Sequence, residues 1–227
     1  MPLIRLNKYL ASLGVASRRK IDEFTIQKRI TINGRIAVPG DKVDSEIDKV
    51  IVDKKIIPPR PQKLVYYLLN KPKYVLSTSR DDRGRDTVLN YVPRTTRVYP
   101  VGRLDFESTG LILLTNDGDL SLRLTHPRYH LPKVYLVTVL GKVSPTKITS
   151  MVSPTVKAEV FKQENNHTII KITLFEGKKR QIRLMCASSH LYVVDLQRIS
   201  IGPIQLNNLA PGEYRELNRE ELKSIRL

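Results

Sequence analysis

A proline-rich segment divides this chain into two parts and constrains its fold more than any other single feature. Pro58, Pro59 and Pro61 lie within one tetrapeptide. Proline cannot continue a helix or sit inside a central strand, and closely spaced prolines favour a stiff, extended backbone. We therefore place a domain boundary here, with a small domain over residues 1–59 and a larger domain over residues 60–227.

The small N-terminal part has the pattern of two short helices followed by a hairpin. Apolar residues at helical spacing indicate the first helix: Leu6, Tyr9, Leu10 and Leu13. Gly14 is suited to end this helix, and Ser17 can cap a second one. Asn33-Gly34 between alternating apolar residues predicts a tight turn, and Val50–Val52 predicts a further strand. From physics alone, this unit is either an RNA-binding module or a two-helix dimerisation domain with a solvated basic face.

Positive charge is spread along the whole chain rather than collected in a tail. The net charge is +17, of which residues 1–59 carry +5 and residues 60–227 carry +12. Both parts could therefore contact one polyanion, and nucleic acid is the first candidate. The basic residues that we predict to contact RNA are Arg5, Lys8, Arg18, Arg19, Lys20, Lys28, Arg29, Arg35, Arg103, Lys178, Lys179 and Arg180.

Other features of the sequence exclude several classes of protein. Cys186 is the single cysteine, so an internal disulfide framework is excluded. The first residues lack the continuous apolar core of a signal peptide. Apolar runs such as Leu64–Leu69 are far shorter than the roughly 20 residues that a membrane helix needs. We expect a soluble, cytoplasmic protein with no membrane partner.

The larger part is rich in predicted strands with scattered helices between them. Predicted strands cover Leu64–Leu69, Val75–Thr78, Leu111–Leu114, Val134–Val139, Val156–Phe161, His167–Leu174 and Tyr192–Leu196. Predicted helices cover Leu120–Leu124, Pro145–Met151, Lys179–Ser188 and Arg219–Ile225. Because strict alternation of strand and helix is missing, the fold class is α+β. We expect a small N-terminal α/β RNA-binding domain plus a domain with a mixed, mainly antiparallel sheet flanked by helices and loops.

One stretch of the larger part is a candidate for chemistry. Asp105 lies in a loop between Gly102 and Gly110, directly before the apolar strand at Leu111–Leu114. Such a loop can present a single carboxylate rigidly at the edge of a cleft. The alternative is structural, because Asp105 could equally cap a turn or form a loop clamp with Arg103.

Several motifs together resemble a known family. Arg5–Lys20 and Ile30–Arg35 resemble the alpha-L (S4-type) RNA-binding domain. Gly102–Asp105 resembles the G-R-L-D signature of the RsuA/RluB/RluF-type ribosomal RNA pseudouridine synthases. Further matches follow the family's order across nearly the whole chain: Asn70–Pro72, Gly84–Val88, Lys133–Tyr135, Glu176–Arg183, Leu196–Arg198, Ile201–Gly202 and Leu209–Arg215.

The resemblance implies an isomerase that converts uridine to pseudouridine in ribosomal RNA. The C–N glycosidic bond breaks, the base turns and a C–C bond forms, after the base has been flipped into a pocket. Asp105 would be the catalytic aspartate, Arg183 its guanidinium partner and Tyr135 the tyrosine that stacks on the base. The sequence leaves open whether the aspartate attacks C6 of the base or C1′ of the sugar, or whether a proton is removed at C2′.

Three residues depart from the family pattern. Tyr74 and His190 stand where glycine is usual, and Leu184 stands where many relatives have a second arginine. A tyrosine at position 74 implies either a different turn or an added stacking surface. These departures motivate an alternative function, that of a non-catalytic RNA-binding or ribosome-assembly factor that keeps the fold. The presence of Asp105, Tyr135 and Arg183 argues against this alternative and favours the enzyme.

The reaction is internal to its substrate, so we expect no cofactor, and the histidines and cysteine give no metal-ligand cluster. The expected partner is ribosomal RNA or a ribosomal precursor particle, with a weak preference for the large subunit. We expect a monomer. A DNA-binding role is less favoured, because the N-terminal helices do not present a convincing major-groove recognition helix.

Overall fold

The computed structural model describes residues 3–59 and 62–226. The chain consists of two compact units, residues 1–64 and 65–227. The division falls after Leu64, whereas the predicted boundary falls after Pro59. Arg60 and Pro61 of the predicted linker lie outside the described residues. No described helix is long and apolar enough to cross a membrane.

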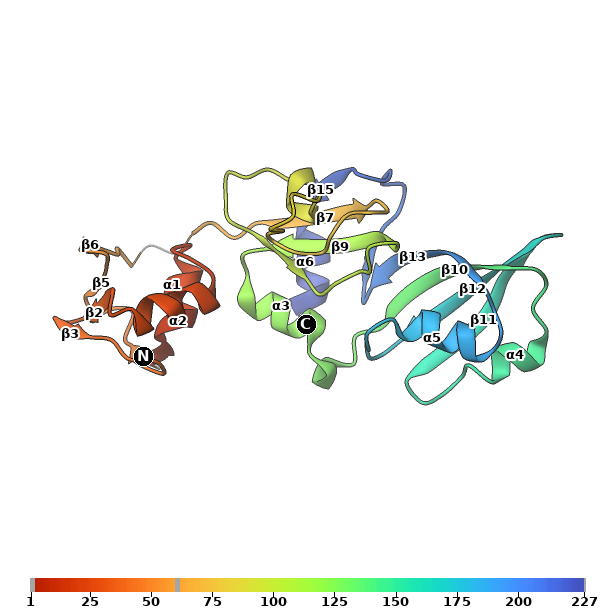
Figure 1. Cartoon of the computed structure of the whole chain (residues 1–227), viewed down its shortest axis with the longest axis horizontal. Coiled ribbons are helices and arrows are strands. Elements are labelled where there is room, and N and C mark those ends of the chain that lie inside the picture. The colour runs from red at the N-terminus through yellow and green to blue at the C-terminus, as the bar shows by residue number, and fades with distance from the viewer. Residues whose placement is uncertain (1–2, 60–61, 227) are drawn as a thin grey trace. The chain divides into compact units, whose positions relative to one another are not determined.

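The N-terminal unit combines two helices with short strands (Figure 1). Its elements are β1 (Ile4–Arg5), α1 (Leu6–Ser12), α2 (Arg18–Ile26), β2 (Ile30–Ile32), β3 (Arg35–Ile36), β4 (Lys42–Val43), β5 (Val50–Val52) and β6 (Lys55–Ile56). Four of these strands form a sheet in the order β3-β2-β5-β6, and β1 pairs separately with β4. A core of buried apolar residues, including Leu10, Ile21 and Ile30, joins helices to sheet.

Local signals in this unit act as predicted. Ser17 caps α2 by accepting a hydrogen bond from the Lys20 backbone N–H at 3.2 Å. Asn33 and Gly34 both adopt positive φ, at 50° and 86°, as a two-residue turn between paired strands requires. The helix–turn–helix and hairpin predictions are therefore confirmed.

The larger unit is built on one nine-stranded sheet (Figure 1). Its strands are β7 (Tyr66–Lys71), β8 (Tyr99–Val101), β9 (Thr109–Thr115), β10 (Lys133–Leu140), β11 (Val156–Gln163), β12 (His167–Leu174), β13 (Val193–Ile201), β14 (Ile204–Gln205) and β15 (Tyr214–Glu216). Its helices are η1 (Val88–Tyr91), α3 (Gly118–Thr125), η2 (Pro127–Tyr129), α4 (Pro145–Thr149), α5 (Gln181–Ser188) and α6 (Arg219–Arg226).

The sheet is mixed and mainly antiparallel, which confirms the predicted fold class. Its order is β11-β12-β10-β13-β9-β7-β15, with β14 on β13 and β8 on β9. Among the described strand pairs, β13 and β9 run parallel and the others antiparallel. Helix α5 contributes Ile182 and Cys186 to one core over β10, β12 and β13. Helices α3 and α6 cover a second core over β7 and β9.

The predicted strand at Val75–Thr78 is wrong. Leu76 makes a single parallel bridge to Thr87, and the residues after it bend. Ser77 instead uses its hydroxyl to hold Leu104, donating to the Leu104 C=O at 2.8 Å and accepting from its N–H at 3.0 Å. The residues that favour a strand therefore tether the loop that carries Asp105.

Candidate active site

The loop that carries Asp105 is held on both sides. Ser77 fixes Leu104 on one side. On the other, the Ser108 N–H donates to the Asp105 C=O at 3.1 Å, and the Tyr74 N–H donates to the Phe106 C=O at 2.7 Å. The half-buried Asp105 side chain is therefore presented from a defined turn, directly before β9.

A close approach between β9 and β13 sets the surroundings of this turn. Gly110 adopts a φ of 102°, and a Cβ there would lie 2.2 Å from the Arg198 carbonyl oxygen. Only glycine tolerates both conditions. Arg198 strengthens the joint by donating from Nε to the Leu111 C=O at 2.7 Å. The parallel joint brings the Asp105 turn next to β13, which also pairs with β10.

Tyr135 enters the site from β10. It pairs with Arg198 across the β10–β13 ladder, and a bulge lies between Val134 and Tyr135. Bulges redirect side chains and are common beside active sites. Asp105, Tyr135 and Leu196 line one cleft of about 570 Å³. The structure thus brings the predicted aspartate and tyrosine to the same cleft.

Basic residues surround this cleft. Those that line it are Arg103, Lys133, Lys178, Lys179, Arg180 and Arg198. Lys178 forms an ion pair with Glu176 at 3.1 Å. Burial, reinforced by the charge of Arg198, lowers the pKa of Lys133. With more cations than carboxylates and an aromatic ring on its wall, the cleft is suited to a ligand that is both anionic and ring-bearing.

Arg183 approaches the turn that carries Asp105, but its nearest described carboxylate is that of Glu107. It lies on α5 and is not among the residues that line the cleft. Its Nη1 lies 3.9 Å from Oε2 of Glu107, and the described residues show no ion pair between Arg183 and Asp105. Its Nε is buried without a hydrogen-bond partner. Arg183 therefore reaches the Asp105 turn two residues past the aspartate.

Lys71 is a buried residue within electrostatic reach of Asp105 that sequence reasoning missed. It ends β7 and lies opposite Gly110 in the ladder with β9. Its side chain is fully buried, and its ammonium donates to the Pro72 C=O at 2.8 Å. Burial lowers the pKa of Lys71 to about 8, against the opposing effect of the Asp105 charge. Its place in an Asn-Lys-Pro motif after an apolar strand was the available signal.

The predicted RNA-contact residues of the N-terminal unit are exposed, but their charges differ in availability. Arg29 pairs with Asp53, and Arg35 pairs with Asp41 at 2.9 Å. Lys20 pairs with Glu23 at 2.6 Å. Arg5, Lys8, Arg18, Arg19 and Lys28 are the remaining exposed members of the set. Of these, Arg18, Arg19 and Lys28 make no ion pair within the described part of the chain, so they are the most available for phosphate.

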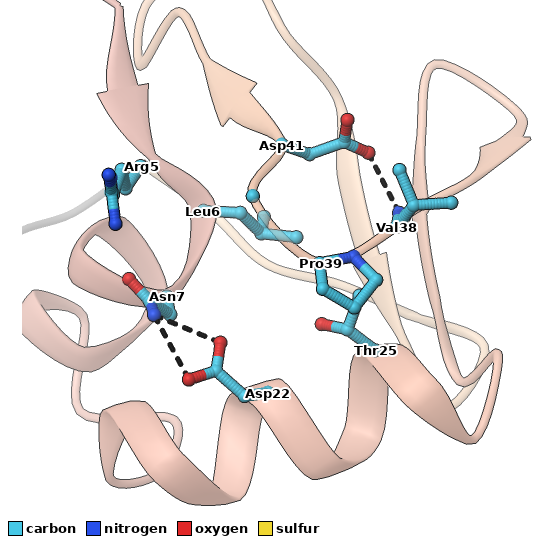
Figure 2. A pocket seen from close by; sticks show the side chains of 9 residues that line it. Arg5, Leu6, Asn7, Asp22, Thr25, Val38, Pro39 and Asp41 are labelled. Atoms are coloured by element: carbon cyan, nitrogen blue, oxygen red, sulfur yellow. Dashed lines mark hydrogen bonds between the residues drawn. The ribbon is translucent and has the colours of Figure 1, made fainter.

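A pocket of about 230 Å³ in the N-terminal unit has a different character (Figure 2). Asn7 of α1 donates from Nδ2 to both carboxylate oxygens of Asp22 on α2, at 2.9 and 3.1 Å. Asp41 also lines the pocket and accepts from the Val38 N–H at 2.9 Å. With two carboxylates in its wall, this pocket does not favour phosphate. The contact instead ties α1 to α2.

Two of the three unusual residues keep the backbone that glycine would adopt. Tyr74 has a φ of 63°, and His190 has a φ of 52° directly after the C-cap residue of α5. The turn at Tyr74 is therefore not rebuilt, and its ring instead packs against Phe106 with centroids 5.6 Å apart. Leu184 is exposed on α5.

Comparison with known proteins gives consistent matches to both units. The RNA pseudouridylate synthase family model matches residues 65–188, and the S4 domain model matches residues 4–46. The chain is 40% identical to an RNA pseudouridine synthase of Aquifex aeolicus, over 98% of this chain and 93% of that protein. It is 34% identical to ribosomal large subunit pseudouridine synthase B of Bacillus subtilis, over 98% and 95% of the two chains.

A solved structure matches as well. The crystal structure of a pseudouridylate synthase superposes with a TM-score of 0.68 at 29% identity, covering 98% of this chain and 99% of the other.

Proposed function

The chain belongs to the RNA pseudouridylate synthase family, and we propose that it isomerises one specific uridine in ribosomal RNA to pseudouridine. The observation that carries this proposal is the single cleft that Asp105 and Tyr135 share with a surplus of cations. Members of the family are isomerases, and the cleft offers what that chemistry needs.

The isomerisation needs a carboxylate next to the target nucleoside. The bond between N1 and C1′ breaks, the base turns, and a bond between C5 and C1′ forms. The proton that leaves C5 is balanced by one gained at N1, so no redox partner takes part. We assign Asp105 as the catalytic residue that acts covalently on the substrate or removes a proton from it. Attack at C6, attack at C1′ and proton removal at C2′ all remain compatible with one carboxylate.

Tyr135 and the surrounding cations serve to hold the nucleotide. A uridine in folded RNA is stacked, so it must be flipped out before the carboxylate can reach it, at a cost of a few kcal/mol. We assign the Tyr135 ring to the face of the flipped base. Arg103, Lys179 and Arg180 lie around the same cleft and would hold the flanking phosphates. Arg183 would orient the turn through Glu107 in the free protein and become available to Asp105 or RNA when substrate binds.

The N-terminal unit serves as an RNA anchor in this proposal. Its S4 domain presents Arg18 and Arg19 at the start of α2, where free backbone N–H groups also favour phosphate. We propose large-subunit ribosomal RNA as the substrate, supported by the name of the Bacillus subtilis relative. The protein would act as a monomer in the cytoplasm, during ribosome biogenesis.

The test is to map pseudouridine after incubation with unmodified ribosomal RNA. The purified protein and Asp105→Asn are incubated with large- and small-subunit transcripts, and the products are mapped by carbodiimide adduct formation and primer extension. We expect one new stop in the large-subunit RNA, and its loss with Asp105→Asn. The variant should still fold and bind RNA, because the side chain changes by one charge and almost no volume.

Two outcomes would contradict the proposal. Turnover by Asp105→Asn at the wild-type level would show that another residue carries the chemistry. Tight binding by the wild-type protein, with no stop in naked RNA or in ribosomal precursor particles, would favour a non-catalytic assembly factor.

A further inference from the structure

An exposed aromatic pair lies beside the candidate active site and is not used by the proposed chemistry. Tyr74 is 64% exposed and Phe106 is 40% exposed. Their rings contact each other with centroids 5.6 Å apart and planes inclined by 60°. Each ring leaves aromatic surface uncovered, which is unusual for side chains that gain so much from burial.

The backbone at Tyr74 indicates that the ring itself is the reason for a tyrosine here. Its φ of 63° is costly for any bulky residue and free for glycine. Glycine would also keep the 2.7 Å hydrogen bond from the N–H of residue 74 to the Phe106 C=O, because that bond uses only backbone atoms. A tyrosine therefore adds strain and a ring but no new backbone contact.

The position of the pair relates it to the target nucleotide. Phe106 directly follows Asp105, and the Tyr74 backbone is hydrogen-bonded to the same turn. Asp105 lines the cleft, whereas neither ring is among the cleft-lining residues of the described chain. A base stacked on the pair would therefore lie next to the nucleotide in the cleft, not in its place.

The charges around the pair favour a base over a phosphate. Lys73 precedes Tyr74 and pairs with Asp195 at 2.8 Å. Arg183 lies 3.9 Å from Glu107, the residue after Phe106. Lys73 and Arg183 thus each face a carboxylate, whereas Arg103 and Arg180 at the cleft make no ion pair with described residues. A phosphate would have to compete with these carboxylates for the two cations. A nucleobase can stack on the rings without needing a free positive charge.

We propose that Tyr74 and Phe106 form a stacking platform for an unpaired base adjacent to the uridine that enters the cleft. The inference rests on the proposed function, because flipping the uridine is what leaves its neighbour without a stacking partner. The platform replaces that lost stack. It thereby selects RNA sites in which the neighbouring nucleotide is free to leave the helix.

The test separates binding of the neighbouring base from chemistry at the uridine. Tyr74→Gly removes the ring at a backbone position suited to glycine, and Tyr74→Phe keeps the ring without the hydroxyl. With the large-subunit transcript that carries the mapped uridine, Tyr74→Gly should raise KM by about 5- to 150-fold, the range for one lost base–aromatic stack. Its kcat should stay within about twofold, and Tyr74→Phe should behave as wild type.

A second readout reports stacking directly. A stem-loop of that RNA is made with 2-aminopurine in place of the nucleotide on one side of the uridine or the other. One of the two probes should be quenched by the wild-type protein and by Tyr74→Phe, and not by Tyr74→Gly. Tyr74→Asn, which tolerates positive φ without an aromatic ring, should match Tyr74→Gly in both measurements.

A second exposed tyrosine provides the control, and three results would refute either the platform or the proposed function. Tyr192→Ala removes another exposed tyrosine, 72% accessible and outside the cleft lining, and should leave KM unchanged. An unchanged KM in Tyr74→Gly refutes the platform while leaving the proposed function intact. A fall in kcat alone also refutes it, because the ring would then act only through the Asp105 turn. Absence of pseudouridine formation by the wild-type protein refutes the proposed function itself.

Discussion

Lys71 should make the stability of the larger unit depend on pH in a way that can be calculated. Its side chain is fully buried, and its pKa of about 8 lies below the ordinary value of 10.5. Below pH 8 both folded and unfolded chains carry the charge, so the folded chain bears the full cost of burying it. At about 1.36 kcal/mol per pH unit, that cost is about 3 kcal/mol at pH 7.

The cost falls as the pH rises, because the folded chain releases the proton before the unfolded chain does. Between pH 7 and pH 9, about 1.3 kcal/mol of stability should return. Lys71→Met removes the titrating group and keeps most of the volume. The free energy of unfolding of the wild-type protein, minus that of Lys71→Met, should therefore increase by about 1.3 kcal/mol over this range.

Urea unfolding at pH 7, 8 and 9 measures this difference, with one spectroscopic probe in the larger unit used for both proteins. Lys142→Met, a change at an exposed lysine, serves as the matched control and should run parallel to wild type. Titration of the Lys71 side chain by NMR gives an independent value for its midpoint. If the wild-type and Lys71→Met stabilities changed in parallel from pH 7 to 9, the reasoning from burial would be refuted.

Two further changes test the joint of the sheet and the RNA anchor. Gly110→Ala places a Cβ 2.2 Å from the Arg198 carbonyl oxygen and should destabilise the protein by more than about 3 kcal/mol. A melting temperature lowered by roughly 10 °C is the expected measurement, and a shift below about 2 °C would contradict the role of the joint. Arg18→Gln combined with Arg19→Gln should weaken RNA binding and reduce the slope of log K against log salt by about 1.5. An unchanged slope would show that α2 does not contact phosphate.

Local signals were sufficient where a residue's conformation depends on its own chemistry. The Asn33-Gly34 turn and the Ser17 cap are of this kind, since each needs only the residue type and its neighbours. Val75–Thr78 was wrongly predicted as a strand for the opposite reason. Its partner is not a neighbouring strand but the loop that ends at Leu104, and no local pattern records that contact.

In the candidate site, too, residues with a sequence motif could be predicted and tertiary contacts could not. Asp105 and Tyr135 were identified by motif, and the structure places both in one cleft. The sequence could not predict which carboxylate Arg183 approaches. Asp105 and Glu107 lie on one turn, and residue spacing does not show which of them a residue on α5 contacts. Burial of Lys71 was equally hidden, since a lysine at the end of a strand is normally exposed.

The distribution of paired and unpaired cations separates two kinds of RNA contact. Arg18 and Arg19 on α2, and Arg103 at the cleft, make no ion pair with described residues, so salt should strongly weaken the phosphate contacts that we propose for them. Lys73 and Arg183 face carboxylates. At the neighbouring aromatic pair, the contact that we propose with a base is stacking rather than charge. Stacking releases no counterions. The contribution of the platform to RNA binding should therefore persist at salt concentrations that remove the phosphate contacts. We therefore propose that the unpaired cations supply affinity for RNA and that the aromatic pair selects the neighbouring nucleotide.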